Sequence, residues 1–238
     1  MKIRISLTLL LILCLVKLNS QNSFNSDTTA IKKTHDPSSC VNIIVPNGNA
    51  LGKGNFYYRN SDILFNSFGY GITRNININA VIDLYSTVKT ISGSSKTPTF
   101  AILPQYNFNL SPKIHAGLGF VYTITETRLT EYNSVLPVLS FNYGNKDNYI
   151  GMNLAYGFFD VTNVKTQVYS IFFQLKTAEK WRFLSEYIYF ENGGMLNIGL
   201  KHLSQKRTIS FGLNNFIINK FGVIPLPFFI VTFGNKRK

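Results

Sequence analysis

Alternation with a period of two, repeated in segment after segment, is the feature that most constrains what this chain can fold into. Between residues 99 and 110, Phe100, Ile102 and Tyr106 alternate with smaller or polar residues. Such a period is that of a β-strand with one apolar face. Ten segments of roughly the length that a tilted strand needs to cross a bilayer show it: 62–72, 75–86, 99–110, 115–124, 134–144, 148–159, 166–176, 180–190, 194–203 and 207–217.

The two faces of these segments differ in a way that indicates their surroundings. One face is apolar and aromatic throughout, and the other mixes glycine with polar residues such as Asn77, Gln105 and Asn153. A soluble sandwich should carry polar residues on the face that points away from its core. An apolar outside around a polar inside favours a membrane barrel, with a secreted β-sandwich adhesin as the alternative.

The connections alternate in length, which indicates how the strands follow one another. Short connections lie around Arg74, Lys113 and the ranges 145–147, 177–180 and 204–206, and they alternate with longer ones such as 87–97 and 125–133. Short periplasmic turns and longer outer loops are typical of outer-membrane barrels. The sequence therefore predicts an up-and-down barrel with its basic short turns in the periplasm.

Parity adds two strands to the ten. An even-stranded barrel with both ends of the chain in the periplasm needs a strand before 62–72 and another after 207–217. The segments 54–60 and 226–233 can supply them. The predicted fold class is all-β: a transmembrane antiparallel up-and-down β-barrel of about twelve strands, with ten as the minimum.

The first fifty residues differ from the rest of the chain. Lys2 and Arg4 precede an apolar run from Leu7 to Val16, so residues 1–20 are predicted to be a cleaved signal peptide. Residues 21–53 are rich in Ser, Thr and Asn and are predicted to form a mobile periplasmic N-terminal arm that contains Cys40. The barrel then occupies residues 54–238, and no run after residue 20 is long and apolar enough for a membrane helix.

Several short motifs carry a resemblance. Ala50-Leu51-Gly52-Lys53-Gly54 leads into Tyr57-Tyr58-Arg59-Asn60, and Tyr70-Gly71-Ile72-Thr73 and Pro225-Leu226-Pro227-Phe228 follow later. Over about 45–233 the chain resembles an uncharacterised family of outer-membrane β-barrels from Bacteroidota. The resemblance implies a barrel in the outer membrane of a Gram-negative bacterium, and it implies no activity. There is one departure: outer-membrane barrels usually end on an aromatic residue that the assembly machinery reads, and here Phe233 is followed by five further residues.

A search for chemistry finds no convergent set of catalytic groups. His202-Leu203-Ser204 resembles the His-x-Ser of outer-membrane lipid A deacylases, but Phe216 stands where the orienting carboxylate is expected. No histidine, cysteine or carboxylate cluster has metal-site spacing. The glycine pairs at 52/54, 69/71 and 117/119 lack the third glycine and the helix of a dinucleotide site. We expect no enzyme activity, cofactor or metal, and a barrel-embedded lipid-modifying hydrolase is the alternative.

The position of the positively charged residues indicates which partners the protein has. The formal charge of +13 is concentrated at the short turns and the C-terminus, where it would face anionic headgroups. Nucleic-acid binders instead interleave bases and aromatic residues on one face. The expected partners are outer-membrane lipids and the barrel assembly machinery, with a small polar solute as possible cargo and no nucleic acid.

Five titratable residues fall on the inner face and are the candidate site residues: Asp83, His115, Arg182, Glu186 and Lys201. A pairing that sets Leu184 opposite Lys201 would place Glu186 one diagonal away, within reach of a salt bridge. Paired charges would brace a filled interior, and separate charges would line a water path. The sequence thus predicts a small barrel of unassigned substrate, either a narrow porin-like channel or a plugged structural or binding barrel.

Overall fold

The computed structural model describes residues 36–63, 65–92, 99–126, 131–159, 164–190, 193–204, 207–218 and 222–235, and the predicted signal peptide lies outside them. Twelve strands and one helix make up these residues, and residues 34–238 form one unit. The elements are β1 (Phe56–Ser61), β2 (Phe65–Gly71), β3 (Ile76–Asp83), α2 (Leu84–Ile91), β4 (Phe100–Ser111), β5 (Ile114–Glu126), β6 (Glu131–Gly144), β7 (Tyr149–Phe159), β8 (Val164–Lys176), β9 (Trp181–Phe190), β10 (Gly193–Leu203), β11 (Arg207–Ile218) and β12 (Gly222–Asn235).

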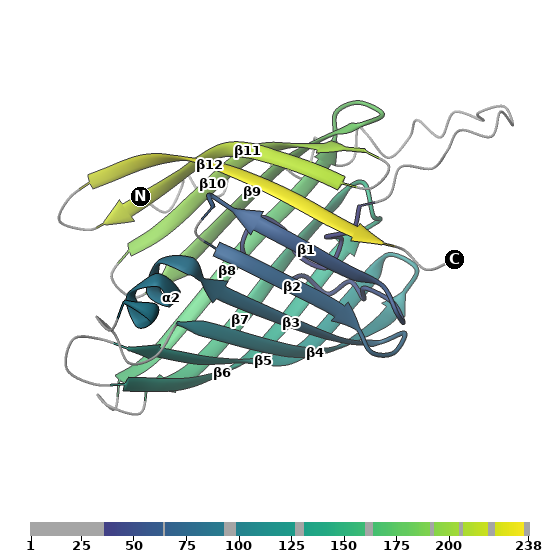
Figure 1. Ribbon diagram of the computed structural model, residues 1–238. Coiled ribbons are helices and arrows are strands. Elements are labelled where there is room, and N and C mark those ends of the chain that lie inside the picture. Colours follow the sequence, from purple (N-terminus) through teal and green to yellow (C-terminus); the bar gives the residue numbers. More distant parts are fainter. Residues whose placement is uncertain are drawn as a thin grey trace, which may run out of the picture. The chain divides into compact units, whose positions relative to one another are not determined.

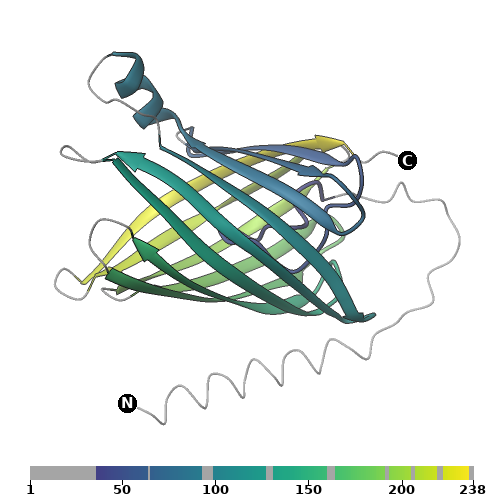
Figure 2. The ribbon, with the colours of Figure 1, turned by 90° about the horizontal axis from the view of Figure 1, so that it is seen from below.

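The strands form one closed barrel in which each strand pairs with its neighbours in sequence. Every ladder is antiparallel, and β1 closes the ring by pairing with β12, from Phe56 opposite Asn235 to Ser61 opposite Ile230. The predicted twelve-stranded up-and-down barrel is therefore confirmed. Figures 1 and 2 show the tilted strands from two sides. We call the end that carries the connections 72–75, 112–113, 145–148, 177–180 and 204–206 the short-turn end, and the opposite end the loop end.

The outer face is apolar and the inner face is polar over much of its length. Gln105, Gly119 and Val138 are register partners on the inner face, while their neighbours Tyr106 and Leu118 are exposed on the outer face. The inner amides include several that are almost fully buried: Asn77, Asn79, Gln105, Asn107, Asn142, Asn153, Gln174 and Asn197. A closed ring with this division leaves no pair of apolar faces to form a β-sandwich.

One predicted strand ends early. The expected strand 75–86 stops at Asp83, and the chain continues as helix α2. Leu84, Val88 and Ile91 recur at helical spacing, and the hydroxyls of Ser86 and Thr87 donate to the Asp83 carbonyl at 2.9 and 2.8 Å. These local bonds satisfy the last carbonyl of β3 and begin the helix. No helix among the described residues is long and apolar enough to cross a membrane.

The outer face supplies a direct test of the membrane assignment. Phe120, in the middle of β5, exposes 47% of its surface, so Phe120→Arg should destabilise the barrel by about 2–4 kcal/mol near the bilayer midplane. The matched control is Leu110→Arg beside the short turn, which should cost about 0–1 kcal/mol near the interface. Urea unfolding in lipid vesicles measures both. Equal losses at the two positions would contradict the membrane assignment.

Candidate functional site

The lumen contains a piece of the chain's own N-terminal region. Residues 36–55, which we call the inner segment, run inside the ring of strands before β1 begins (Figures 1 and 2, purple). The segment folds into a small hairpin: Val41 bridges Pro46, and the Asn42 amide donates to the Val45 carbonyl at 2.9 Å. The predicted mobile arm is therefore wrong for residues 36–53, and residues 21–35 lie outside the described residues. Its polar composition suggested disorder, yet the lumen wall supplies partners for these polar groups.

Glu186 of β9 holds the tip of this hairpin. The carboxylate has no exposed surface and accepts hydrogen bonds from the backbone amides of Ile43 and Ile44 at 3.0 and 3.1 Å. The side-chain amides of Asn42 and Asn197 donate to it at 3.0 and 3.1 Å. Successive backbone amides that converge in this way form a natural anion site. Here the inner segment supplies the amides, and the anion is the Glu186 carboxylate of the barrel wall.

Arg59 of β1 binds the same tip through its carbonyl groups. The buried guanidinium donates to the Asn42 carbonyl at 3.3 Å and also to the Ile43 carbonyl. The backbone amides of this turn therefore bind Glu186, and its carbonyl groups bind Arg59, which lies on a different strand of the wall. Hydrogen bonds to charged groups each contribute about 1.5–3 kcal/mol, so this pair fixes the position of the tip.

Uncharged side chains of the wall complete the contacts. The Gly48 amide donates to Asn142 at 3.1 Å, and the Leu51 amide donates to Asn77 at 2.9 Å. Gln105 and Asn153 donate to the Asn47 and Pro46 carbonyls at 3.1 and 2.8 Å. The four wall residues lie on four strands: Asn142 on β6, Asn77 on β3, Gln105 on β4 and Asn153 on β7. The inner segment is therefore bonded to strands all around the barrel.

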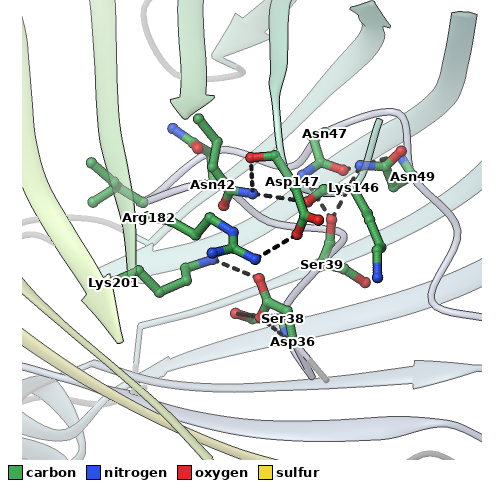
Figure 3. A network of polar contacts seen from close by, with 12 residues as sticks. Asp36, Ser38, Ser39, Asn42, Asn47, Asn49, Lys146, Asp147, Arg182 and Lys201 are labelled. Carbon is green, nitrogen blue, oxygen red and sulfur yellow. Dashed lines mark hydrogen bonds and ion pairs between the residues drawn. The ribbon is translucent and has the colours of Figure 1, made fainter. Parts of the chain in front are cut away.

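Asp36 fixes the beginning of the segment. Its carboxylate lies 2.9 Å from the Lys201 ammonium of β10, and Figure 3 shows this pair beside the Arg182–Asp147 pair, which measures 2.6 Å. Burial would raise the pKa of Asp36, but Lys201 and the hydrogen bonds with Ser38 outweigh it and hold the pKa below its ordinary value. The pair therefore stabilises the fold above about pH 4 and loses that contribution as the pH falls through the lowered pKa.

Apolar contacts accompany the polar ones. Cys40 and Leu51 pack with Tyr57 of β1, and Ile43 packs with Leu184 and Phe228 of the wall. Burial raises the pKa of the Cys40 thiol to about 12, so the thiol stays protonated and unreactive at neutral pH.

Glycine allows the segment to approach the wall closely. A Cβ atom on Gly71 of β2 would lie 1.9 Å from the Gly52 carbonyl oxygen. A Cβ atom on Gly48 of the segment would lie 2.9 Å from the His115 carbonyl oxygen. Any larger residue at these two positions would push the segment away from the barrel wall.

The five candidate residues all lie on the inner face, but the structure uses them differently. Arg182, Glu186 and Lys201 are buried and bonded at the short-turn half of the barrel. His115 is partly exposed, and its Nδ1 lies 2.6 Å from the Asn109 oxygen. Asp83 lies at the loop end, where β3 gives way to α2. The inner segment contacts Glu186 and Lys201 through bonds that no sequence pattern indicated.

The predicted pairing of Glu186 with Lys201 is wrong. Lys201 lies opposite Arg182, and Glu186 lies opposite Asn197, so the two strands are displaced by two residues from the expected register. The hairpin turn allowed both registers, because a shift of two keeps every side chain on its own face. Glu186 binds the segment tip and Lys201 binds Asp36.

Three residues that the candidate set lacked complete this site: Asp36, Asn42 and Arg59. Arg59 could have been found, since it alternates with Tyr58 in a predicted strand and so faces inward. Asp36 and Asn42 follow no periodic pattern, and their contacts span 165 and 144 residues of sequence.

The described residues show no arrangement for catalysis or metal binding. His202 lies on the outer face with its ring 4.8 Å from that of Trp181, so it packs against an aromatic neighbour. Within the described parts of the chain, no group of three or more His, Cys, Asp or Glu side chains could hold a metal ion.

Comparison with known proteins gives a likeness of fold. No family model and no curated protein matches the chain. The KdgM porin superposes with a TM-score of 0.54 over 76% of this chain and 99% of its own, at 10% sequence identity. KdgM in complex with disordered oligogalacturonate gives the same values. The toluene transporter TbuX of Ralstonia pickettii has a TM-score of 0.44 over 73% of this chain and 67% of its own, at 9% identity. The likeness to KdgM shows that the two chains share the barrel fold.

The ion pair at Asp36 predicts a specific pattern of coupling. Lys201→Ala should destabilise the barrel by about 3–5 kcal/mol because it leaves a largely buried carboxylate unpaired. A double-mutant cycle with Asp36→Ala should give a coupling of about 0.5–3 kcal/mol, measured by urea unfolding in detergent micelles. The control cycle with Glu186→Ala should give a smaller coupling, because Glu186 and Lys201 bind different residues and are linked only through the inner segment. Strong coupling in the control cycle would contradict the observed register.

Proposed function

We propose that this protein is an outer-membrane barrel whose lumen is closed at the short-turn end by its own inner segment. Solute would pass along the axis only when that segment moves. The proposal rests on one observation: inner-face residues of β1, β3, β4, β6, β7, β9 and β10 all bond to the segment. Binding on so many sides favours a plug over a tail that passes through an open pore.

The placement in the outer membrane of a Gram-negative bacterium is supported by the apolar outer face and by the export signal read from the sequence. Exposed apolar and aromatic side chains cover the outside of the strands, which suits lipid rather than water. The motif resemblance favours a Bacteroidota source. Outer-membrane lipids and the barrel assembly machinery are the partners that such a placement requires.

A small polar solute is the cargo that the short-turn half of the lumen favours. KdgM has been solved with oligogalacturonate, and it shares this fold. Displacement of the inner segment would expose a wall of amide side chains, including Asn77, Gln105, Asn142 and Asn153. These groups can exchange hydrogen bonds with a polar solute. We propose transport or binding rather than catalysis, because the inner face around the segment holds mainly amides and charged side chains that are bonded to the segment or to one another.

Conductance in planar bilayers tests the closure. The full-length protein should conduct little, and deletion of residues 36–53 should give steady open channels. Deletion of 22–34, upstream of the segment, is the matched control and should leave the barrel closed. Glu186→Gln, which keeps the size of the side chain but weakens the acceptor, should raise the frequency of openings. A full-length barrel that conducts as well as the deletion variant would rule out the plug.

Cysteine labelling on intact cells tests the orientation. Val88→Cys in exposed α2 should react with a membrane-impermeant maleimide, and Lys146→Cys in a short turn should react only after the outer membrane is permeabilised. Cys40 should contribute no background because it is buried and protonated. Labelling of the Lys146 variant on intact cells would invert the proposed orientation.

A further inference from the structure

The barrel wall is much lower at β1, β2 and β3 than elsewhere. These strands have six, seven and eight residues, whereas β12 has fourteen. β12 pairs with β11 from Gly222 onward but with β1 only from Ile230 onward. Among the described residues, 222–229 therefore form a strand edge without a ladder on the β1 side, which we call the free edge. Figure 1 shows β1 ending far short of the beginning of β12. At about 3.3 Å per residue, the free edge is about 26 Å long.

The free edge presents fewer donors than an unpaired edge normally does. Phe229 turns its backbone toward β1: its amide donates to the Asp62 carboxylate at 2.6 Å, and its carbonyl accepts from the Asp62 amide at 2.8 Å. In a regular strand every second residue points the same way, so residues 227, 225 and 223 face this edge too. Pro225 and Pro227 have no N–H, whereas Val223 keeps its donor at the far end of the edge.

This chemistry lowers the cost of placing the edge in an apolar setting. An unpaired backbone group costs several kcal/mol in hydrocarbon, and of the four residues that face this edge two have no donor and Phe229 is bonded to Asp62. Asp62 and Ile63 both have positive φ, 54° and 66°. Such a backbone conformation costs energy for Ile63 in particular, because its side chain is β-branched. The turn is thus held in a strained form that delivers the Asp62 carboxylate to the edge.

Apolar side chains line the lumen beside the free edge. Ile224 and Leu226 project inward from β12 and leave 41% and 48% of their surfaces accessible. Phe65 of β2 and Val81 of β3 face inward from the low part of the wall and are also exposed, and Asp83, the register partner of Phe65, lies on the same face at the end of β3. This loop-end half of the inner face differs from the short-turn half, where buried amides and charges bind the inner segment.

Exposed apolar groups continue on the outer side of the same opening. Val223 and Phe229 lie on the outer face of β12, and Ile63 projects from the turn after β1. An apolar surface therefore runs from outside the barrel, past the low wall, to the inner face at the loop end.

We propose that the low wall is a lateral entrance through which an apolar small molecule dissolved in the bilayer reaches a binding site at the loop-end half of the lumen. An apolar occupant fits because the lining offers dispersion and burial but few hydrogen bonds. A strand from a second copy fits poorly, since Pro225 and Pro227 cannot donate to it. The inference rests on the proposed membrane placement and uses the inner segment as the floor of the site.

Binding of a fluorescent apolar probe tests the site. N-phenyl-1-naphthylamine should bind the full-length barrel in detergent micelles saturably, and Leu226→Asn should weaken binding at least tenfold. Leu118→Asn, equally exposed on the outer face of β5, is the matched control and should leave the affinity unchanged. Heat-modified migration on gels checks that both variants fold. Probe binding that does not saturate, or that Leu226→Asn leaves intact, would overturn the site.

Cysteine reactivity tests the lateral route independently of affinity. In nanodiscs, Ile224→Cys should react with lipid-soluble pyrenyl maleimide at least tenfold faster than Val168→Cys, which faces the lumen from β8. A water-soluble sulfonated maleimide should show no such preference. Equal rates with the lipid-soluble reagent, or a preference of the sulfonated reagent for Ile224→Cys, would mean entry from water and would overturn the entrance. Closure by the inner segment is judged separately by conductance, so failure of one proposal can be told from failure of the other.

Discussion

A carboxylate buried inside a barrel needs hydrogen-bond donors, and Glu186 obtains them from the backbone of the inner segment. The amides of Ile43 and Ile44 and the side chain of Asn42 converge on it, while Arg59 takes the carbonyls of the same turn. The segment and the wall each need the other for hydrogen bonds: the turn of the segment has unpaired backbone amides and carbonyls, and the wall has buried charged side chains. Their union holds the segment in the short-turn half of the lumen, where we propose that it blocks the axis.

The two halves of the lumen follow different chemistry because they have different neighbours. At the short-turn end, amides and charges are buried against the segment. Buried polar groups need hydrogen-bond partners, and the segment supplies many of them. At the loop end several inner side chains near the low wall are apolar and accessible, with Asp83 and Ser67 among them, so this part suits molecules that form few hydrogen bonds. In the proposed arrangement the barrel combines a polar, closed axial path with an apolar lateral surface. This division explains why the alternation of polar and apolar residues weakens toward the loop end of β12.

The free edge of β12 shows how a membrane barrel can keep an interrupted wall. Closure normally removes every edge, since hydrocarbon offers no partner for backbone groups. Here Pro225 and Pro227 remove donors that would be unpaired, and Asp62 binds the amide of Phe229. These groups lower the cost of the interruption, and the positive φ angles at Asp62 and Ile63 belong to the turn that supplies the Asp62 carboxylate.

The sequence by itself determined the strands, their faces and their number. A period of two is local, and the need for an even number of strands supplied β1 and β12. It also placed Asp83, His115, Arg182, Glu186 and Lys201 on the inner face. Only the tertiary structure decided the register of β9 against β10, because a shift of two preserves the faces, and the early end of β3. The tertiary structure alone also shows that residues 36–55 bind inside the barrel, since their partners lie up to 165 residues away. Polar composition cannot distinguish a free arm from a segment whose partners line a lumen.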